Sequence, residues 1–224
     1  MVSTNGTGSG RRDEIRRDYA SLARDYETRW RAFNTPARDW ILAQWPADLA
    51  PDGRVLDLAC GTGGLLAALG ARHPGLGLFG LDLSPDMLAR ARIALPGAAL
   101  VEGDATAPPF RDGAFDVVCA LNLLHHLDSV SDHLDILAAL CRPGGTVFLC
   151  TFQPEGSPLT RLADWWLRRT HPAWRGIVSG ADLERAVASN PALSILRSDV
   201  LSAGRFWRLR ILQLARAQTP PADV

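Results

Sequence analysis

Short apolar runs along the middle of the chain alternate with segments of helical spacing. The runs lie at 54–58, 76–83, 99–102, 115–121 and 146–152, and the helical segments lie at 64–70, 85–95 and 129–140. Strands that are apolar at nearly every position are typical of a parallel sheet whose two faces are both covered by helices. The pattern therefore predicts an α/β fold.

The N-terminal part of the chain has a helical pattern instead. Over residues 13–45, apolar and aromatic side chains recur every three or four positions at Ile15, Tyr19, Leu22, Tyr26 and Trp30. Such a stripe predicts a helix that packs one face against the rest of the protein. We expect Pro36 to interrupt this segment, because proline removes a helical hydrogen bond. Residues 1–12 are expected to form a flexible tail.

The C-terminal part has two further strand-like runs. They lie at 193–201 and 206–214, after a helix predicted at 180–189. Only residues 202–204 separate the two runs, and so short a link permits a hairpin, so the last strand should be antiparallel. We therefore predict a Rossmann-like, doubly wound sheet of about seven strands, mostly parallel, in a single domain over 13–224.

Composition limits the partners of the protein. The 224 residues carry 24 basic and 24 acidic side chains, and the formal net charge is zero. Non-specific binding to nucleic acid depends on excess positive charge, so nucleic acid is not expected as a partner. No run of about 18 apolar residues is present, so no transmembrane segment is expected. The four cysteines form no C-x-x-C pair, and we expect a reduced, cytoplasmic protein without a metal site.

A glycine-rich loop follows the first strand in the stretch VLDLACGTGG. In an open α/β sheet, ligands bind beyond the carboxyl ends of the strands, where this loop lies. A phosphate-binding P-loop is excluded because the chain has no lysine, and a G-x-G-x-x-G dinucleotide loop is excluded because Leu66 takes the third glycine's place. The pattern that fits is acidic-x-small-x-Gly-x-Gly, formed by Asp57, Ala59, Gly61 and Gly63.

Four further segments follow this loop in order. They read LFGLDLSPDML, EGDATAPPF, FDVVCALNLLHHL and LCRPGGTVFL. With the glycine loop, they make residues 50–152 resemble a class I S-adenosylmethionine-dependent methyltransferase. The resemblance implies S-adenosyl-L-methionine as methyl donor and S-adenosyl-L-homocysteine as product.

The resemblance also implies roles for individual residues in holding this donor. Gly61 and Gly63 would let the backbone approach the methionine part, and Asp57 would receive its ammonium group. Asp82 would bind the ribose hydroxyls, and Asp104 the adenine amino group. Further contacts with the donor are expected from Ala59, Leu83, Met87, Ala105, Leu121 and Tyr19.

Catalysis and acceptor binding are assigned to three other segments. His125 or His126 is a candidate general base, although such a pair also shapes a pocket or caps a helix. The resemblance implies that residues 13–50 form a lid, in which Tyr19 and Tyr26 would close over the sulfonium. The alternative is that these two tyrosines only pack on the sheet. Residues 153–180 would recognise the acceptor, or form an amphipathic cover helix. The candidate acceptor contacts are Asn122, Trp30, Phe152, Trp165 and Trp166, and Tyr26 is a candidate catalytic residue.

The acceptor itself is left open. A small-molecule or lipid-like acceptor is favoured, and the arginines of residues 153–180 allow peripheral contact with a membrane. Methylation of RNA or protein is a second interpretation, against which stand the neutral charge and the absence of an N-P-P-Y motif after the fourth strand. A regulatory module that binds the donor without catalysis is a third. The oligomeric state is not predicted.

Overall fold

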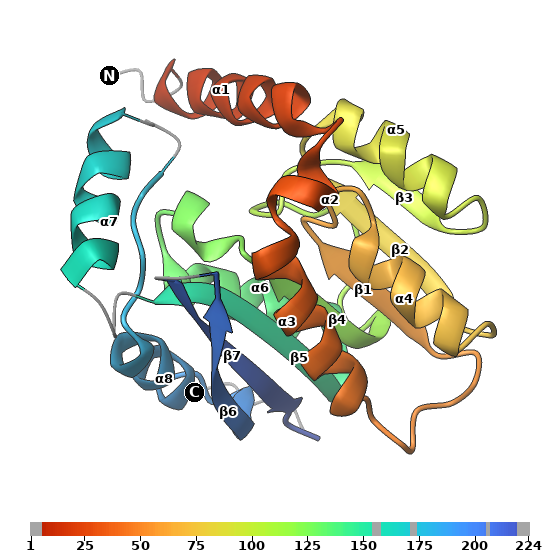
Figure 1. The fold of residues 1–224 in the computed structure, drawn as a ribbon. Coiled ribbons are helices and arrows are strands. Elements are labelled where there is room, and N and C mark those ends of the chain that lie inside the picture. Colours follow the sequence, from red (N-terminus) through yellow and green to blue (C-terminus); the bar gives the residue numbers. More distant parts are fainter. Residues whose placement is uncertain (1–5, 154–157, 171–173, 205–206, 219–224) are drawn as a thin grey trace.

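The computed structural model describes residues 6–153, 158–170, 174–204 and 207–218, and its centre is one seven-stranded sheet (Figure 1). The strand order is β3-β2-β1-β4-β5-β7-β6. Strands β1 to β5 pair in parallel, whereas β7 runs antiparallel to both β5 and β6. The predicted fold, including the antiparallel last strand, is confirmed. The strands are β1 (Arg54–Leu58), β2 (Gly77–Asp82), β3 (Ala99–Glu102), β4 (Phe115–Leu121), β5 (Cys141–Gln153), β6 (Leu193–Ala203) and β7 (Trp207–Arg216).

Helices cover both faces of this sheet, as the continuous apolar strands require. Along β4, Val118 packs into the core beneath α6 and α8, while its neighbours Val117 and Cys119 pack into the opposite core beneath α3 and α4. The alternation follows from the two-residue period of a strand. The helices are α1 (Gly6–Leu22), α2 (Tyr26–Arg29), α3 (Arg31–Ala43), α4 (Gly64–Arg72), α5 (Pro85–Ala94), the 3-10 helix η1 (Leu124–His126), α6 (Val130–Leu140), α7 (Pro158–Thr170) and α8 (Gly180–Ala188).

The N-terminal segment differs from the expectation in two respects. Helix α1 begins at Gly6, so residues that were expected in a flexible tail are helical. Pro36 lies inside α3, and the helical segment is instead interrupted near Asp25 and at Trp30. The buried side chains of Ala37 and Ile41 hold α3 against the sheet, and this burial outweighs the hydrogen bond that Pro36 cannot donate.

No helix in the described part of the chain is both long and apolar enough to cross a membrane.

Candidate active site

A cavity of about 250 Å³ opens at the carboxyl ends of β1, β2 and β4. The sheet order reverses between β1 and β4, which is where α/β sheets bind their ligands. The cavity is lined by Arg12, Ile15, Tyr19 and Tyr26 from the N-terminal helices, and by Ala59, Gly61, Leu81–Ser84, Gly103–Thr106, Leu121–Leu123, His126–Asp128 and Arg175. An adjoining cavity of about 50 Å³ contains Asp57, Glu27, Asn34, Arg38 and Thr62.

The glycine loop turns sharply at the floor of the main cavity. Ala59, Gly61 and Gly63 have φ angles of 79°, 53° and 81°. Gly61 faces the cavity, and a Cβ atom there would lie 3.6 Å from the Tyr26 ring. At Gly63 a Cβ atom would lie 2.6 Å from Leu95 Cδ1, so this glycine permits the packing of α4 against the end of α5. Gly61 thus lines the cavity, as a place beside the donor would require, whereas Gly63 does not line it.

Asp82 ties the glycine loop to the end of β2. Its Oδ2 accepts a hydrogen bond from the Gly61 N–H at 2.8 Å, and its Oδ1 accepts one from the Ser84 N–H at 2.8 Å. Burial raises the pKa of Asp82, while these backbone N–H groups lower it again. Ser84 in turn caps α5 by accepting the Met87 N–H, as its sequence position predicts. A carboxylate oxygen has lone pairs for a second donor, so Asp82 can still receive hydroxyl groups from the cavity.

Asp57 is a buried carboxyl group with an unsatisfied atom. Its Oδ1 has no hydrogen-bond partner among the described residues. Burial raises the pKa of Asp57 to about 7, and the charge of Asp82 adds to this effect. A buried acceptor of this kind is unfavourable unless a donor reaches it. An ammonium group would satisfy it and restore the carboxylate form.

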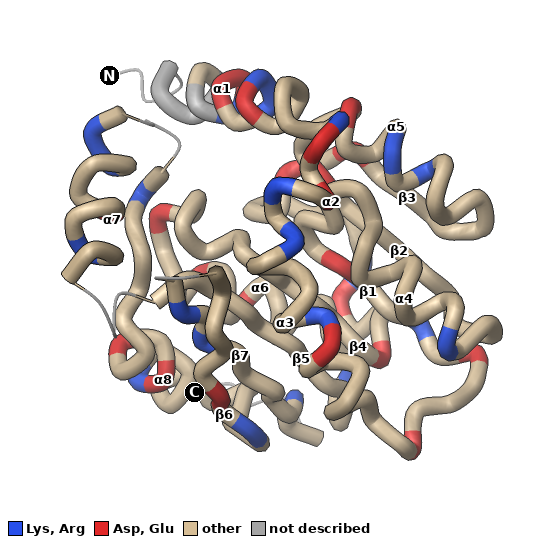
Figure 2. Tube along the Cα trace, viewed as in Figure 1, with Lys and Arg blue, Asp and Glu red and all other residues tan. Residues whose placement is uncertain are grey.

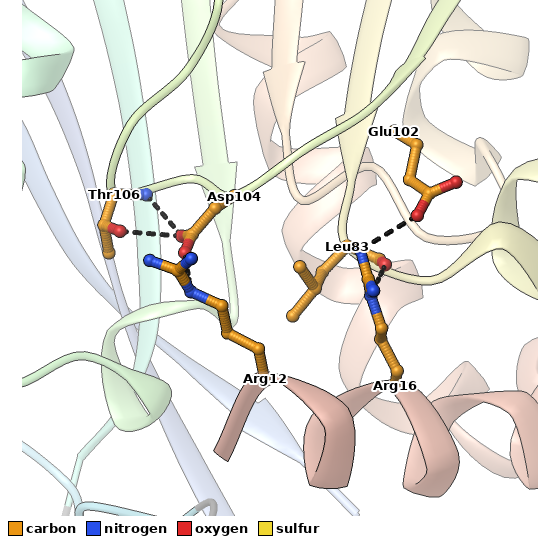
Figure 3. A network of polar contacts seen from close by, with 6 residues as sticks. All are labelled: Arg12, Arg16, Leu83, Glu102, Asp104 and Thr106. Atoms are coloured by element: carbon orange, nitrogen blue, oxygen red, sulfur yellow. Dashed lines mark hydrogen bonds and ion pairs between the residues drawn. The ribbon is translucent and has the colours of Figure 1, made fainter. Parts of the chain in front are cut away.

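Asp104 lines the main cavity just beyond the end of β3 and is held by three donors (Figure 3). Its Oδ1 accepts hydrogen bonds from the backbone and hydroxyl groups of Thr106, both at 2.8 Å. Its Oδ2 lies 2.6 Å from Nε of Arg12. One turn further along α1, Arg16 donates to the Leu83 carbonyl at 3.1 Å and pairs with Glu102 at 2.9 Å. Helix α1 is therefore pinned by two arginines over this part of the cavity.

Helix α2 covers the glycine loop in a similar way. The Thr62 hydroxyl donates to the Glu27 carboxylate. A Cβ atom on Gly64 would lie 3.0 Å from Glu27 Oε1, so the two segments are in close contact. Helices α1 and α2 together form the N-terminal cover.

Tyr19 and His126 meet at the wall of the main cavity. The Tyr19 hydroxyl oxygen and His126 Nε2 are hydrogen-bonded at 2.8 Å. The rings of Tyr19 and Tyr26 lie 6.3 Å apart. Burial raises the pKa of both tyrosines, so both keep their protons and present neutral aromatic rings to the cavity.

The ring of His125 lies 4.0 Å from the His126 ring but behind it, outside the cavity lining. It is buried, does not line the cavity, and packs 4.4 Å from the Trp174 ring and 5.1 Å from the Phe152 ring. Burial and the neighbouring His126 lower the pKa of His125 well below its usual value, so its ring is neutral. The η1 turn thus gives the two adjacent histidines different environments.

The remaining predicted residues fall into two groups. Leu83, Ala105, Leu121 and Asn122 line the main cavity. Outside its lining are Met87, which is a buried residue of α5, Trp30 and Phe152, which belong to an aromatic cluster with Phe33, and Trp165 and Trp166, which are exposed on α7.

Sequence reasoning missed the charged residues of the cover. Arg12 was placed in the tail, and Arg16 and Glu27 were given no role. The signal that would have found Arg12 is its spacing: it precedes Ile15 by three positions and Tyr19 by seven, which puts all three on one helical face.

Comparisons with known proteins agree with this geometry. A family model described as methyltransferase domain matches residues 56–149. The demethylmenaquinone methyltransferase of Thermus thermophilus is 33% identical over 180 residues, which are 76% of this chain and 82% of that protein. The trans-aconitate 2-methyltransferase of Methylobacterium nodulans is 40% identical over 115 residues, which are 49% of this chain and 41% of that protein. A solved structure of geranyl diphosphate C-methyltransferase from Streptomyces coelicolor, with S-adenosyl-L-homocysteine bound, shares 15% identity and a TM-score of 0.67 over 80% of this chain and 75% of that one.

The sheet order and the acidic strand ends define a Rossmann-like methyltransferase fold. The chain belongs to the class I S-adenosylmethionine-dependent methyltransferases, and S-adenosylmethionine is its methyl donor. The residues present fit this donor, because Asp57 Oδ1 lacks a partner that an ammonium would supply and the backbone at Gly61 is open to the cavity.

Proposed function

We propose that this enzyme methylates a small-molecule or lipid-like acceptor beside His126. In this proposal Asp82 holds the ribose hydroxyls of the donor, Asp104 its adenine amino group and Asp57 its ammonium group. The observation that carries the proposal is one continuous cavity that joins Asp82, Asp104 and His126. The relatives named above are described as acting on demethylmenaquinone and trans-aconitate, which supports a small-molecule acceptor here too.

The donor supplies a methyl group on a sulfonium sulfur, which is already a good leaving group. The protein's part is to align the acceptor and to exclude water, and alignment can supply roughly 7–11 kcal/mol of the barrier. Asp82 fixes the glycine loop through the Gly61 N–H. Tyr19 and Tyr26 are the residues of the cover whose neutral aromatic rings line the cavity, and such rings favour a positive charge nearby.

A general base is needed if the acceptor is a hydroxyl or a protonated amine. We assign this role to His126 Nε2 acting through the Tyr19 hydroxyl 2.8 Å away: the Tyr19 oxygen takes the proton of the acceptor while the Tyr19 proton passes to Nε2. We do not assign the role of general base to His125, because its ring packs against Trp174 and Phe152. Its role is to support the cavity wall from behind, as Trp30 and Phe152 do. Asn122 remains our candidate for direct contact with the acceptor.

We further propose that the enzyme works in the cytoplasm. The four cysteines are all free and buried, which suits a reducing compartment.

A thermal melt of the full chain tests the proposed donor site. S-adenosylhomocysteine at 100 times its dissociation constant should stabilise the enzyme by about 2.7 kcal/mol, which for a domain of this size is a shift of roughly 5–11 °C. Asp82→Ala should lose this shift. Asp116→Ala is the matched control, because Asp116 also accepts a backbone N–H, from Arg54 at 2.8 Å, at the other end of β1. A full shift in Asp82→Ala would contradict the site. Release of S-adenosylhomocysteine with candidate acceptors then identifies the substrate.

A further inference from the structure

Helix α7 presents its apolar side chains outward. Leu159, Leu162, Trp165 and Trp166 are 51%, 60%, 51% and 51% exposed. The inward side carries Thr160, which is buried, and Asp164, which is partly buried. A helix that merely covers a globular domain does the opposite and buries its apolar face. In Figure 1 the helix lies at the periphery of the molecule, beyond the end of the sheet that carries β6 and β7.

Hydrogen bonds explain how α7 is held in this orientation. Asp164 Oδ1 accepts the indole N–H of Trp174 at 2.7 Å and the Ile177 N–H at 3.1 Å. Its Oδ2 accepts a hydrogen bond from Arg168 Nε at 2.9 Å. The helix is therefore attached to the body by its polar side, and the four apolar residues are left at the surface.

The charge of the helix adds a second observation. Helix α7 carries three basic residues, Arg161, Arg168 and Arg169, and a single acidic one, Asp164. Figure 2 shows the basic positions along the helix. The guanidinium of Arg169 lies 3.9 Å from the centre of the Trp165 ring. Exposed tryptophan and leucine beside arginine are the composition of helices that lie in the interface of an anionic membrane.

We propose that α7 docks the enzyme on an anionic lipid bilayer, with Leu159, Leu162, Trp165 and Trp166 entering the interface and Arg161 and Arg169 meeting the lipid phosphates. Excess positive charge on the same surface as the apolar residues favours this partner over a second copy of the chain, because two identical basic surfaces repel each other. The proposal concerns a surface outside the cavity and does not depend on the roles given to Asp82 or His126.

The docking surface is connected to the active-site cavity. Trp174, which donates to Asp164, packs 4.4 Å from the His125 ring. The next residue, Arg175, donates its N–H to the His125 carbonyl at 2.7 Å and lines the cavity. A bilayer under α7 would therefore lie one short segment away from the cavity wall, which suits an acceptor that partitions into lipid.

Flotation of the full chain with vesicles tests the proposal. We expect binding to vesicles of phosphatidylcholine with phosphatidylglycerol to be at least about tenfold stronger than to phosphatidylcholine alone. Trp165→Ser/Trp166→Ser should lower binding at least about tenfold. Arg161→Gln/Arg169→Gln should remove most of the preference for anionic vesicles. Ile93→Ser is the matched control, because Ile93 on α5 is 79% exposed but far from α7 in sequence, and it should bind like the parent chain.

Each variant must show the same thermal shift with S-adenosylhomocysteine as the parent chain, which separates this test from that of the donor site. The proposal is overturned if the parent chain binds neither kind of vesicle, or if the tryptophan variant binds as the parent does. It is also overturned if sedimentation shows a dimer that the tryptophan variant abolishes, since α7 would then cover a second copy.

Discussion

The main cavity has two walls that are built differently. The sheet wall consists of loops at the carboxyl ends of β1, β2, β3 and β4, and its carboxylates accept backbone N–H groups two residues away, as in Asp82 with Ser84 and Asp104 with Thr106. The N-terminal cover makes its contacts through long side chains, as in Arg12 with Asp104 at the main cavity and Glu27 with Thr62 at the adjoining one. The sheet wall is therefore pre-formed by its own backbone, whereas the cover is attached through side-chain contacts between residues far apart in the chain.

His126 lies where the two walls meet, and its substitution should have the largest effect on turnover. If it acts as general base, His126→Ala lowers kcat by about 100-fold or more while S-adenosylhomocysteine binding changes little. His125→Ala is the matched variant, and we expect loss of stability from poorer packing against Trp174 with kcat within a few-fold of the parent. Steady-state kinetics and isothermal titration with S-adenosylhomocysteine distinguish them. Equal kcat in His126→Ala and the parent would remove the base from the mechanism.

Asp57 tests the sheet wall at the methionine end. Its pKa of about 7 means that binding of an ammonium group, which favours the carboxylate, should release a proton. Affinity for S-adenosylhomocysteine should therefore rise as pH rises from 6 to 8. Asp57→Asn should weaken binding by roughly 10- to 100-fold and flatten this dependence. Titration calorimetry in two buffers of different ionisation enthalpy measures the proton. A parent affinity that does not depend on pH would contradict the role of Asp57.

Asp57 also makes the folding stability of the ligand-free protein depend on pH, but this stability falls as pH rises, whereas the affinity for the ligand increases. The pKa of Asp57 is higher in the folded protein than in the unfolded chain, so the folded state holds the proton more tightly. This contribution is fully present below about pH 4 and is lost as pH rises through 7. Asp57→Asn should therefore have a higher Tm than the parent at pH 8, and the gain should vanish near pH 4. Melting curves at the two pH values check this, and an equal gain at both would indicate a cause other than titration.

Arg12 tests the attachment of the cover, and the expected effect is smaller. Its ion pair with Asp104 is partly exposed, and such pairs contribute about 0.2–1 kcal/mol. Arg12→Ala should speed release of S-adenosylhomocysteine by about two- to fivefold in stopped flow. Arg17→Ala is the control, because Arg17 is on the same helix and is also exposed but does not line the cavity. Slower release in Arg12→Ala would mean that Arg12 competes with the ligand for Asp104 instead of closing the cavity over it.

Ala59 gives the smallest expected effect and concerns the sheet wall alone. Its φ of 79° lies in the left-handed region, which costs a residue with a Cβ about 1–2 kcal/mol. Ala59→Gly relieves this strain but gives the unfolded chain more freedom, which offsets about 0.4–1 kcal/mol. We expect a net gain of about 0.5–1 kcal/mol in the free energy of unfolding by urea denaturation. Ala68→Gly within α4 should instead lose about 1 kcal/mol, and a loss of that kind at Ala59 would contradict the strain.

The sheet wall was predictable because its signals are local. The apolar runs that form β1, β2 and β4 are continuous in the sequence, and each candidate carboxylate lies within two residues of the end of a strand. Parallel strands bring such ends together at one edge of the sheet, so Asp82, Asp104 and the loop at Gly61 could be placed beside one cavity without coordinates. The role of Gly63 could not, because it depends on contact with Leu95 in another helix.

The sequence by itself determined the sheet, its ligand-binding edge and the class of donor, because strand periodicity and loop chemistry act over a few residues. Tertiary structure decided which of two adjacent histidines lines the cavity. Within the η1 turn, His126 is hydrogen-bonded to Tyr19, whereas His125 packs against Trp174. Tertiary structure also decided that Arg12 belongs to the site, because its partner Asp104 is distant in sequence. The outward direction of the α7 tryptophans was decided in the same way, by hydrogen bonds between Asp164 and the segment that follows the helix. Contacts between residues far apart in the chain leave no periodic signal, and only the folded chain contains them.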